Sequence, residues 1–532
     1  MSVRTLEAEV KRRRTFAIIS HPDAGKTTLT EKLLLYSGMI RTAGMVRARK
    51  SGKQASSDWM ALEQERGISI TASAMQFEYQ GAVINVLDTP GHQDFSEDTY
   101  RTLTAADSAI MVIDAAKGVE TQTRKLFAVC ALRGIPVLTF INKMDLPGQD
   151  PFDLLSELEE VLGIEASPHN WPIGSGQEFR GVAECASKKL HLFKKTAAGG
   201  SQQAHSETIS FEDAVNGKVI DSEQLEKLRY ELELLDEAGN NFTEERFLAG
   251  KVTKVFFGSA LTNFGLEPFF DSFVRIAPCP SPRVVDLPDG EEGIVDPRDP
   301  SFSGFVFKIQ ANMDPRHRDS MAFVRVCSGS FERDSSVIHH RTGKSIRLSR
   351  AHRMFAGERD TIDAAYPGDI VGLINPGAIT IGDTISTKGG FNFKPLPRFS
   401  PEVVARIRPK EVIKRKSFDN GMQRLGQEGA VQVLAPLDDP FPDPLIAAVG
   451  QLQFEVLQYR LKSEYNVDTI LEILPYQYGA WLKGDPKTFK KHSRALLAKD
   501  VGGNIVVLFQ SVREKEFSEQ QNPEHQLLSF VQ

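Results

Sequence analysis

The sequence has few cysteines, no long apolar run and no large excess of either charge. Its 532 residues include four cysteines, which lie far apart without a CxxC pair. Neither a zinc site nor a disulfide framework is predicted, and we expect plain thiols in a reducing cytosol. The richest apolar stretch, residues 109–116, contains Asp114 and falls short of the roughly 18 residues that span a bilayer. We therefore expect no membrane insertion and a cytoplasmic protein.

Charge and composition limit the class of protein but not its partners. Lysine and arginine number 64 against 70 for aspartate and glutamate, which gives a net charge of −6. The whole chain therefore does not attract nucleic acid, although local basic faces are compatible with this sum, and we expect no DNA partner. With 41% hydrophobic and 25% charged residues, the composition excludes disorder throughout. At about 150 residues per domain, the length predicts three or four domains.

Residues 1–282 are predicted to form an α/β domain. Apolar runs alternate there with helix-like segments, which is typical of a parallel sheet covered on both faces. The runs are residues 16–19, 83–87, 109–113, 137–141 and 255–257. The segment after Asp150 is predicted to form a helix, with Pro151 in its first turn, helical spacing of apolar residues up to Leu162, and Gly163 at its end. The looser segment 164–252 predicts an insertion with a flexible loop over 197–203 and an acidic helix over 223–237.

The rest of the chain is predicted to form a linker and two further domains. Residues 283–300 are acidic and rich in proline, and they predict an extended linker. Alternating residues and regularly spaced glycines over 301–390 predict a β-barrel. Strand and helix patterns over 391–532 predict an α+β third domain. The expected fold is therefore multidomain α/β plus β.

A loop between a predicted strand and a predicted helix is typical of phosphate binding. It ends in Gly-Lys-Thr, with Ser20 where the usual first glycine stands. Backbone N–H groups at the helix start would cradle phosphate, Lys26 would reach the β- and γ-phosphates, and the Thr27 hydroxyl would bind Mg²⁺. The loop alone does not distinguish ATP from GTP. Its predicted phosphate-binding residues are Ser20, His21, Pro22, Asp23, Ala24, Gly25, Lys26, Thr27 and Thr28.

A second motif follows the apolar run 83–87. Asp88 stands where a carboxylate can hold Mg²⁺ through water, and the Gly91 N–H can contact the γ-phosphate. His92 would then orient the attacking water as a polarising group, which we predict as its catalytic role. The predicted phosphate-binding residues of this motif are Asp88, Thr89, Pro90, Gly91 and His92.

A third motif follows the run 137–141 and predicts guanine selection. The Asp145 carboxylate can accept hydrogen bonds from guanine N1–H and the N2 amino group, an edge that adenine does not offer. Asn142 would brace the loop and face the purine, and the Lys143 stem would lie over the ring. Backbone N–H groups of a later turn would bind guanine O6. The predicted guanine-binding residues are Asn142, Lys143, Met144, Asp145, Ser259 and Ala260.

A loop between the first two motifs predicts a nucleotide-dependent switch. Residues 66–70 read Arg-Gly-Ile-Ser-Ile, and the Ser69 hydroxyl could complete Mg²⁺ coordination when the γ-phosphate is present. The predicted metal ligands are thus Thr27, Ser69 and Asp88.

Together these motifs resemble the translational GTPases. The order of the four motifs carries the resemblance, and Ser57-Asp58-Trp59-Met60, Ser69 and residues 95–103 are similar to the termination factors of this family. Residues 450–457 also resemble the third-domain helix of elongation factor G and its relatives. The resemblance implies a P-loop GTPase domain, an elongation-factor-like β-barrel and a ferredoxin-like third domain. It further implies GTP/GDP and Mg²⁺ as ligands, and a monomer that binds the ribosome after peptide release and promotes departure of the stop-codon-reading release factors.

Three alternative functions agree less well with the sequence. A recycling or ribosome-protection factor would need roughly 150 further residues. A GTP-dependent binding module that does not hydrolyse is disfavoured by His92, and a general P-loop ATPase by Asp145.

Two basic clusters are candidates for ribosomal RNA contact. They are Lys410, Lys414, Arg415 and Lys416, and Lys487, Lys490, Lys491 and Arg494.

Overall fold

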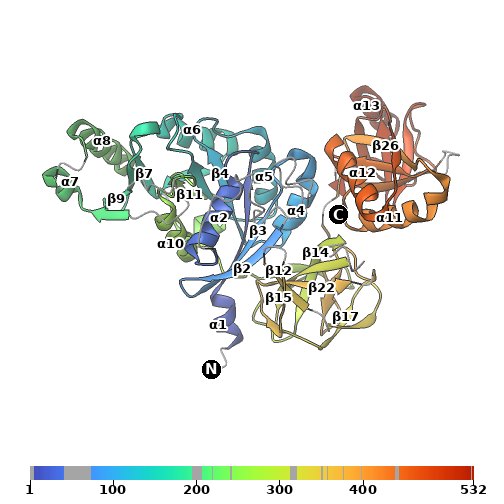
Figure 1. Cartoon of the computed structure of the whole chain (residues 1–532). Coiled ribbons are helices and arrows are strands. Elements are labelled where there is room, and N and C mark those ends of the chain that lie inside the picture. The colour runs from blue at the N-terminus through green and yellow to red at the C-terminus, as the bar shows by residue number, and fades with distance from the viewer. Residues whose placement is uncertain are drawn as a thin grey trace.

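The computed structural model describes residues 5–40, 73–193, 206–217, 220–239, 242–311, 320–348, 351–355, 358–375, 377–396, 398–437, 443–528 and 530–531. The predicted switch at Arg66–Ile70 with Ser69, and the predicted loop 197–203, lie outside these residues. The described elements form three units (Figure 1): an α/β unit in blue to green, a barrel in yellow, and an α+β unit in orange to red.

The first unit is built on a seven-stranded sheet with the order β2-β3-β1-β4-β5-β11-β6. Its strands are β1 (Arg13–Ser20), β2 (Ser73–Tyr79), β3 (Ala82–Asp88), β4 (Ser108–Asp114), β5 (Val137–Asn142), β6 (Glu165–Pro168) and β11 (Val252–Phe257). All neighbours are parallel except β2, which pairs antiparallel with β3. The five predicted runs are thus confirmed as parallel strands, and β2, which was not among them, adds an antiparallel strand at this edge. The reason is a tight hairpin, in which Gln80 and Gly81 have φ of 48° and 80°, as a two-residue β-turn requires.

Both faces of this sheet are buried, as predicted. Phe16 and Ile18 of β1 face one core, and Ala17 and Ile19 face the other. The first core contains α2 (Lys26–Tyr36) and α10 (Leu266–Ile276), and the second contains α4 (Ser96–Thr104), α5 (Thr121–Leu132) and α6 (Pro151–Leu162). The predicted bounds of α6 are confirmed. The Asp150 side chain accepts from the Phe152 N–H at its start, and Gly163 takes a φ of 66° at its end.

The segment predicted as an insertion contributes its first strand, β6, to the main sheet. Its other described residues form a four-stranded sheet with several helices, which Figure 1 shows on the far side of the first unit from the other two. The predicted acidic helix is confirmed as α8. The elements are β7 (Asn170–Ile173), η3 (Gly176–Glu178), β8 (Gly181–Glu184), β9 (Leu190–Phe193), β10 (Ser206–Ile209), α7 (Phe211–Gly217), α8 (Ser222–Ala238) and α9 (Glu244–Leu248).

The segment 283–300, predicted as an extended linker, forms a hairpin instead. Strands β12 (Arg283–Asp286) and β13 (Glu292–Val295) pair antiparallel across a turn at Gly290, whose φ is 86°. β12 also pairs with β24 (Asn392–Phe393), from beyond the barrel. Lys394 donates to Asp286 and Glu292 beside this pair. The prolines stand outside the paired residues and therefore do not interrupt the strands.

The barrel is confirmed between residues 303 and 386. Its main sheet has the order β18-β17-β23-β14-β15-β22-β19-β20. The strands are β14 (Ser303–Ala311), β15 (Ser320–Ser328), β16 (Phe331–Glu332), β17 (Ser336–His339), β18 (Lys344–Arg347), β19 (Ala351–Phe355), β20 (Glu358–Thr361), β21 (Ala364–Ala365), β22 (Ile370–Asn375) and β23 (Thr384–Ser386).

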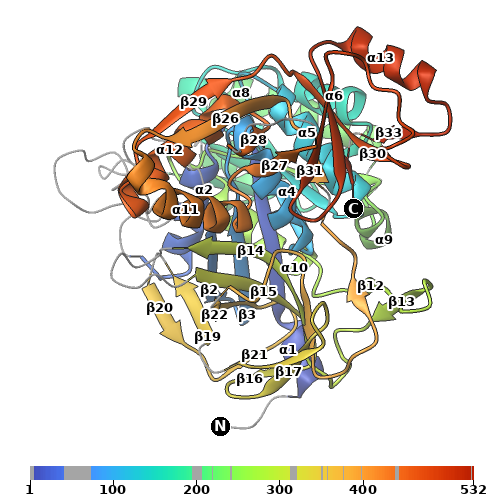
Figure 2. The same ribbon diagram turned by 90° about the vertical axis from the view of Figure 1, so that its right-hand side faces the viewer.

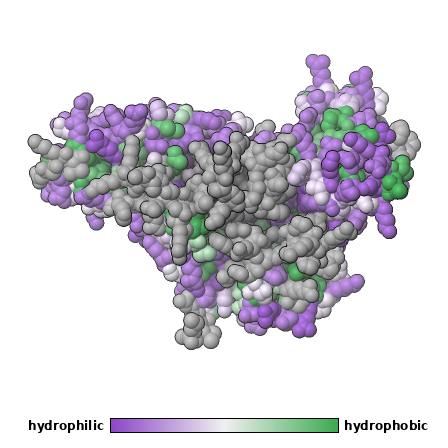
Figure 3. All heavy atoms as spheres, viewed as in Figure 1, coloured by the Kyte–Doolittle hydropathy of each residue, from purple (hydrophilic) through white to green (hydrophobic). Residues whose placement is uncertain are grey.

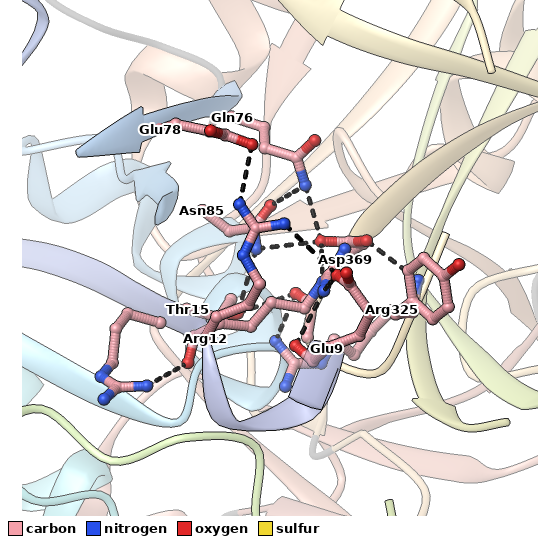
Figure 4. A network of polar contacts seen from close by, with 12 residues as sticks. Glu9, Arg12, Thr15, Gln76, Glu78, Asn85, Arg325 and Asp369 are labelled. Carbon is pink, nitrogen blue, oxygen red and sulfur yellow. Dashed lines mark hydrogen bonds and ion pairs between the residues drawn. The ribbon is translucent and has the colours of Figure 1, made fainter. Parts of the chain in front are cut away.

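A buried polar network joins the barrel to the first unit (Figure 4). Asp369 of the barrel accepts from Arg13 Nε at 2.8 Å and from Gln76 Nε2 at 2.6 Å. Arg325 of β15 binds Asp107 at 2.6 Å, and both side chains are 1% exposed. Glu9 of α1 (Leu6–Lys11) also binds Arg13. These pairings tie strands β1 and β2 of the first unit to the barrel.

The third unit begins with a ferredoxin-like βαββαβ segment, as the resemblance implies. β26 (Val403–Pro409), α11 (Arg415–Gln427), β27 (Gln432–Pro436), β28 (Leu445–Ala448), α12 (Gln451–Tyr465) and β29 (Thr469–Ile473) give the strand order β29-β26-β28-β27. The sheet then continues through β31-β32-β30-β33, which the sequence did not predict. Figure 2 shows this unit above the barrel. Its other elements are η4 (Val412–Lys414), β30 (Tyr478–Lys483), β31 (Leu496–Asp500), β32 (Ile505–Phe509), α13 (Val512–Gln521) and β33 (Gln526–Leu528), with β25 (Arg398–Phe399) paired to β34 (Phe530–Val531).

The described surface is mainly hydrophilic in the view of Figure 3, with scattered apolar patches. Among the described residues, no helix combines the length and the apolar character needed to cross a bilayer.

Candidate functional site

The predicted motifs meet at the carboxyl edge of the seven-stranded sheet. β1, β3 and β5 end at Ser20, Asp88 and Asn142, and the register, with β4 between β1 and β5, places these ends at one edge of the sheet. Loops that leave this edge of a parallel sheet commonly form a ligand site. Here they enclose a cavity of about 480 Å³. It is lined by Ser20, His21, Pro22, Asp23, Gly25, Lys26, Thr27, Thr28, Gly91, His92, Asn142, Lys143, Asp145, Leu146 and Leu261.

Gly25 ends the loop that connects β1 to α2. Gly25 precedes α2 with a φ of 103° and provides no side-chain cap. The first N–H groups of α2 therefore remain available to an anion. A β-carbon on Gly25 would lie 2.1 Å from Asn142 Nδ2. Asp23 also has a positive φ, 64°, a backbone conformation that aspartate tolerates in turns.

The two charged groups predicted at the phosphate end are in contact. Lys26 Nζ binds the Asp88 carboxylate, and both side chains are buried. Thr27 lies next to Lys26 and lines the cavity. A hydroxyl and a carboxylate are oxygen ligands of the kind that Mg²⁺ takes together with phosphate and water. The residues present therefore fit the cation predicted from the sequence.

Asn142 connects two loops of the site. Its Nδ2 donates to the Ala24 carbonyl and its Oδ1 accepts from the Ala260 N–H, both at 2.8 Å. The Ala260 N–H, predicted to bind guanine O6, is thus already bonded. The Ser259 N–H is also used, because it donates to the Phe264 carbonyl at 2.9 Å. These two residues hold the wall of the site in the structure.

The remaining residues of the third motif divide between cavity and core. Asp145 is half-buried at the cavity, and the Lys143 ammonium beside it pairs with Asp114 at 2.7 Å. The Met144 side chain instead lies in the core. Leu146 and Leu261 line the cavity and are 49% and 51% exposed. Neither leucine was predicted from the sequence, although each directly follows a motif and is an apolar residue where a turn is expected.

His92 lies at the edge of the cavity, with a side chain that is 34% exposed. Its Nδ1 accepts from the Asp94 N–H at 3.2 Å. Its ring meets that of Phe95 edge to face, with centroids 6.2 Å apart. His92 therefore shares the cavity with Lys26 and Thr27.

Some predicted residues lie behind the cavity wall. Thr89 donates to the Ile18 carbonyl at 2.6 Å, and the Pro90 carbonyl accepts from Thr99. They fix the turn that carries Gly91. The predicted residues that do not line the cavity are Ala24, Asp88, Thr89, Pro90, Met144, Ser259 and Ala260.

Comparison with known proteins assigns each unit to a family. Residues 11–279 match the elongation factor Tu GTP binding domain, 301–388 match elongation factor G domain 2, and 393–518 match the class II release factor RF3, C-terminal domain. The chain is 53% identical to peptide chain release factor 3 of Gloeobacter violaceus over 98% of both chains. The chain belongs to the peptide chain release factor 3 family. It is 52% identical to the factor of Synechocystis, over 94% of this chain and 92% of that one.

Membership of the peptide chain release factor 3 family makes the chain a translational GTPase of termination, which binds GTP and GDP and hydrolyses GTP. A solved structure from Thermus thermophilus has a TM-score of 0.68 and covers 92% of this chain and 72% of its own. Its sequence identity is 20%, so this likeness concerns the fold alone.

Proposed function

We propose that the chain binds the ribosome after peptide release and uses GTP to promote dissociation of the stop-codon-reading release factors. The observation that carries this proposal is the single cavity lined by all three described motifs, in a chain of this family. We further propose that it acts as a cytoplasmic monomer without DNA or membrane partners.

The phosphate end of the cavity would bind the β- and γ-phosphates. The N–H groups at the start of α2 and the Lys26 ammonium supply hydrogen bonds and positive charge. Thr27 and Asp88, with Ser69 from beyond the described residues, would hold Mg²⁺, which would neutralise charge on the phosphates. The Lys26–Asp88 contact supports this assignment, because it places the Asp88 carboxylate directly behind the ammonium that lines the phosphate end of the cavity.

The opposite end would bind guanine. The Asp145 carboxylate accepts from N1–H and the N2 amino group, and the Lys143 stem and Leu261 supply apolar contact to the ring faces. Asn142 would act mainly as a brace, because both ends of its amide already bind backbone groups. An adenine ring would leave the Asp145 carboxylate without donors, which disfavours ATP.

His92 would orient the attacking water. In phosphoryl transfer, positioning and charge stabilisation matter more than proton removal. Because the Asp94 N–H donates to Nδ1, a neutral His92 carries its proton on Nε2. His92 would therefore donate from Nε2 as a polarising group, as the sequence analysis predicts.

The second basic cluster is the better candidate for RNA contact. In the first cluster Arg415 binds Asp419 and Asp443, and Lys414 donates to the Asn466 carbonyl. In the second, Lys487, Lys490 and Arg494 are exposed. Phosphate contact releases counterions, so reversal of these charges should weaken ribosome binding and flatten its salt dependence.

The deciding experiment follows two reactions with the same protein. GTP turnover is measured with and without ribosomes, and departure of a labelled stop-codon-reading factor is measured on ribosomes after peptide release. We expect both to need ribosome, GTP and protein. Lys26→Ala should lose nucleotide binding, and His92→Ala should keep binding but lose about a hundredfold of stimulated turnover. GTP turnover without accelerated factor departure would refute the proposed task.

A further inference from the structure

The first turn of α12, in the third unit, is capped by a side chain from the first unit. Gly450 occupies the N-cap position and has no side chain to cap the helix. The Leu452 N–H donates instead to Asp94 Oδ2 at 2.9 Å. A carboxylate at this position satisfies a free N–H and lies favourably at the positive end of the helix dipole. Asp94 therefore connects α12 to the first unit by a charge-assisted hydrogen bond.

The Asp94 carboxylate lies very close to the backbone of Gly450. A β-carbon on Gly450 would lie 2.0 Å from Asp94 Cγ and 2.2 Å from its Oδ2. Carboxylate and backbone therefore approach each other more closely than any other residue at position 450 would permit. Beside them, Phe95 packs with Leu452 and Val456 of α12. The short segment η2 (Gln93–Phe95) is thus held by α12 through one polar and one apolar contact.

The same two residues of η2 hold the His92 ring. Asp94 donates its N–H to His92 Nδ1 at 3.2 Å, and its Oδ1 lies 3.4 Å from that nitrogen. Phe95 meets the ring edge to face. Any shift of η2 therefore moves the groups that set the orientation of His92 and the nitrogen that carries its proton.

We propose that Asp94 is a positioning residue through which docking of α12 fixes the orientation and tautomer of His92. When α12 is docked, Oδ2 is engaged by Leu452, η2 is held, and the Asp94 N–H faces Nδ1. Release of α12 frees η2, and His92 loses its fixed geometry. The inference rests on the proposed role of His92 in orienting water, and it makes hydrolysis depend on the position of the third unit.

The test uses Gly450→Ala, which displaces α12 without changing a residue of the first unit, and Asp94→Ala, which removes the carboxylate without adding bulk. Gly389→Ala is the matched control, because its β-carbon would lie 3.9 Å from the nearest atom outside its neighbours. Circular dichroism and GTP affinity establish that each variant is folded. Ribosome-stimulated turnover gives kcat and the KM for ribosomes, and nitrogen NMR of labelled histidine, assigned with His92→Gln, reports the tautomer.

We expect Gly450→Ala and Asp94→Ala each to lower kcat by about tenfold to a hundredfold, the size of a misplacement effect. GTP affinity and the KM for ribosomes should stay within about twofold, and the double variant should fall no further than either single one, because both act through one contact. Asp94→Asn should recover most of kcat, since an amide oxygen also caps a helix. The His92 signals should change from a single neutral tautomer to a mixture in Gly450→Ala and in Asp94→Ala, and not in Gly389→Ala.

Wild-type kcat together with unchanged His92 signals in Gly450→Ala would overturn the inference. A raised KM with unchanged kcat would also overturn it, because the contact would then serve ribosome binding alone. Failure of the proposed function is recognised separately. If His92→Ala turns over like the wild type, His92 has no part in hydrolysis, whereas the NMR comparison still decides whether α12 controls its tautomer.

Discussion

Gly25 and Asn142 fit together so closely that a β-carbon on the glycine would lie 2.1 Å from the Asn142 amide nitrogen. Gly25→Ala should therefore displace Asn142 and break its bonds to Ala24 and Ala260. Loss of those two bonds, together with the strain of a β-carbon on the left-handed backbone at position 25, should cost about 3 kcal/mol of binding free energy. This corresponds to roughly a hundredfold loss of GTP affinity. Equilibrium titration with a fluorescent GTP analogue measures the change.

Gly38→Ala is the matched control for this prediction. Gly38 also has a positive φ, 78°, but its β-carbon would meet nothing within 4 Å. The Gly38→Ala variant should lose about 1 kcal/mol of free energy of unfolding from backbone strain alone and keep the GTP affinity of the wild type. Equal losses of GTP affinity in Gly25→Ala and Gly38→Ala would show that backbone strain, and not loss of the Asn142 contact, lowers the affinity.

Asp145→Asn should exchange guanine for xanthine. The amide donates where the carboxylate accepted, so it suits the C2 oxygen of xanthosine triphosphate and not the N2 amino group of GTP. We expect GTP affinity to fall by more than about a hundredfold and the affinity for xanthosine triphosphate to rise. Asp150→Asn makes the same chemical change at the cap of α6, where asparagine is an equally good cap, and should leave both affinities unchanged. Retained guanine preference in Asp145→Asn would place selection elsewhere.

Arg325→Met should weaken the joint between the barrel and the first unit. It leaves the Asp107 carboxylate buried, with Arg283 at 3.5 Å as its remaining ion-pair partner. Loss of one member of a buried pair costs about 3–5 kcal/mol, so the first thermal unfolding transition should fall markedly. Arg298→Met, which removes an exposed pair with Asp296, should leave that transition unchanged. An unchanged transition in Arg325→Met would mean that the pair does not hold the units together.

His169 should make the first unit sensitive to acid. Burial lowers the pKa of His169 to about 4 from its ordinary value of 6.5, and the positive charge of Lys254 adds to this effect. The unfolded chain therefore binds a proton on His169 below pH 6.5, whereas the folded chain binds this proton only below about pH 4. Stability is full above pH 6.5 and falls through this window, by about 2 kcal/mol at pH 5.

His169→Gln should remove this loss between pH 7.5 and pH 5. Hydrogen exchange of the β6 and β7 amides, corrected for the intrinsic effect of pH, measures the local stability. The variant also changes the hydrogen bond between His169 and Ser272, so the comparison concerns the difference between the two pH values. An equal difference in wild type and variant would assign the acid sensitivity to other groups.

The sequence predicted the site better than the contacts between units. Lys26, His92 and Asp145 could be found because each belongs to a short motif next to a strand, and parallel strands bring such motifs to one edge. The bond from the Ala260 N–H to Asn142, which lies 118 residues earlier, could not be predicted, and contact of Ala260 with guanine stays a prediction. Ser69 lies outside the described residues and stays a prediction.

The fold shows the same division between local and distant information. Helix α6 was predicted to the residue because Asp150, Gly163 and its apolar spacing are all local signals. The hairpin β12–β13 was missed because prolines obscured two short strands. The Asp94–Leu452 contact joins residues 358 positions apart, and nothing in the local pattern of either segment indicates its partner.

The pairing of β12 with β24 also determines how tension would pass along the molecule. Val285 pairs with Phe393 and Asp286 with Asn392, so the chain enters and leaves the barrel at one point. Once the contact between η2 and α12 has opened, a pull between the first and third units therefore loads the pairing of β12 with β24 before it stretches the barrel strands. The two strands are antiparallel and are pulled from the same end. Their residue pairs therefore separate one at a time, beginning with Val285 and Phe393. The barrel strands would be the last part of this connection to stretch.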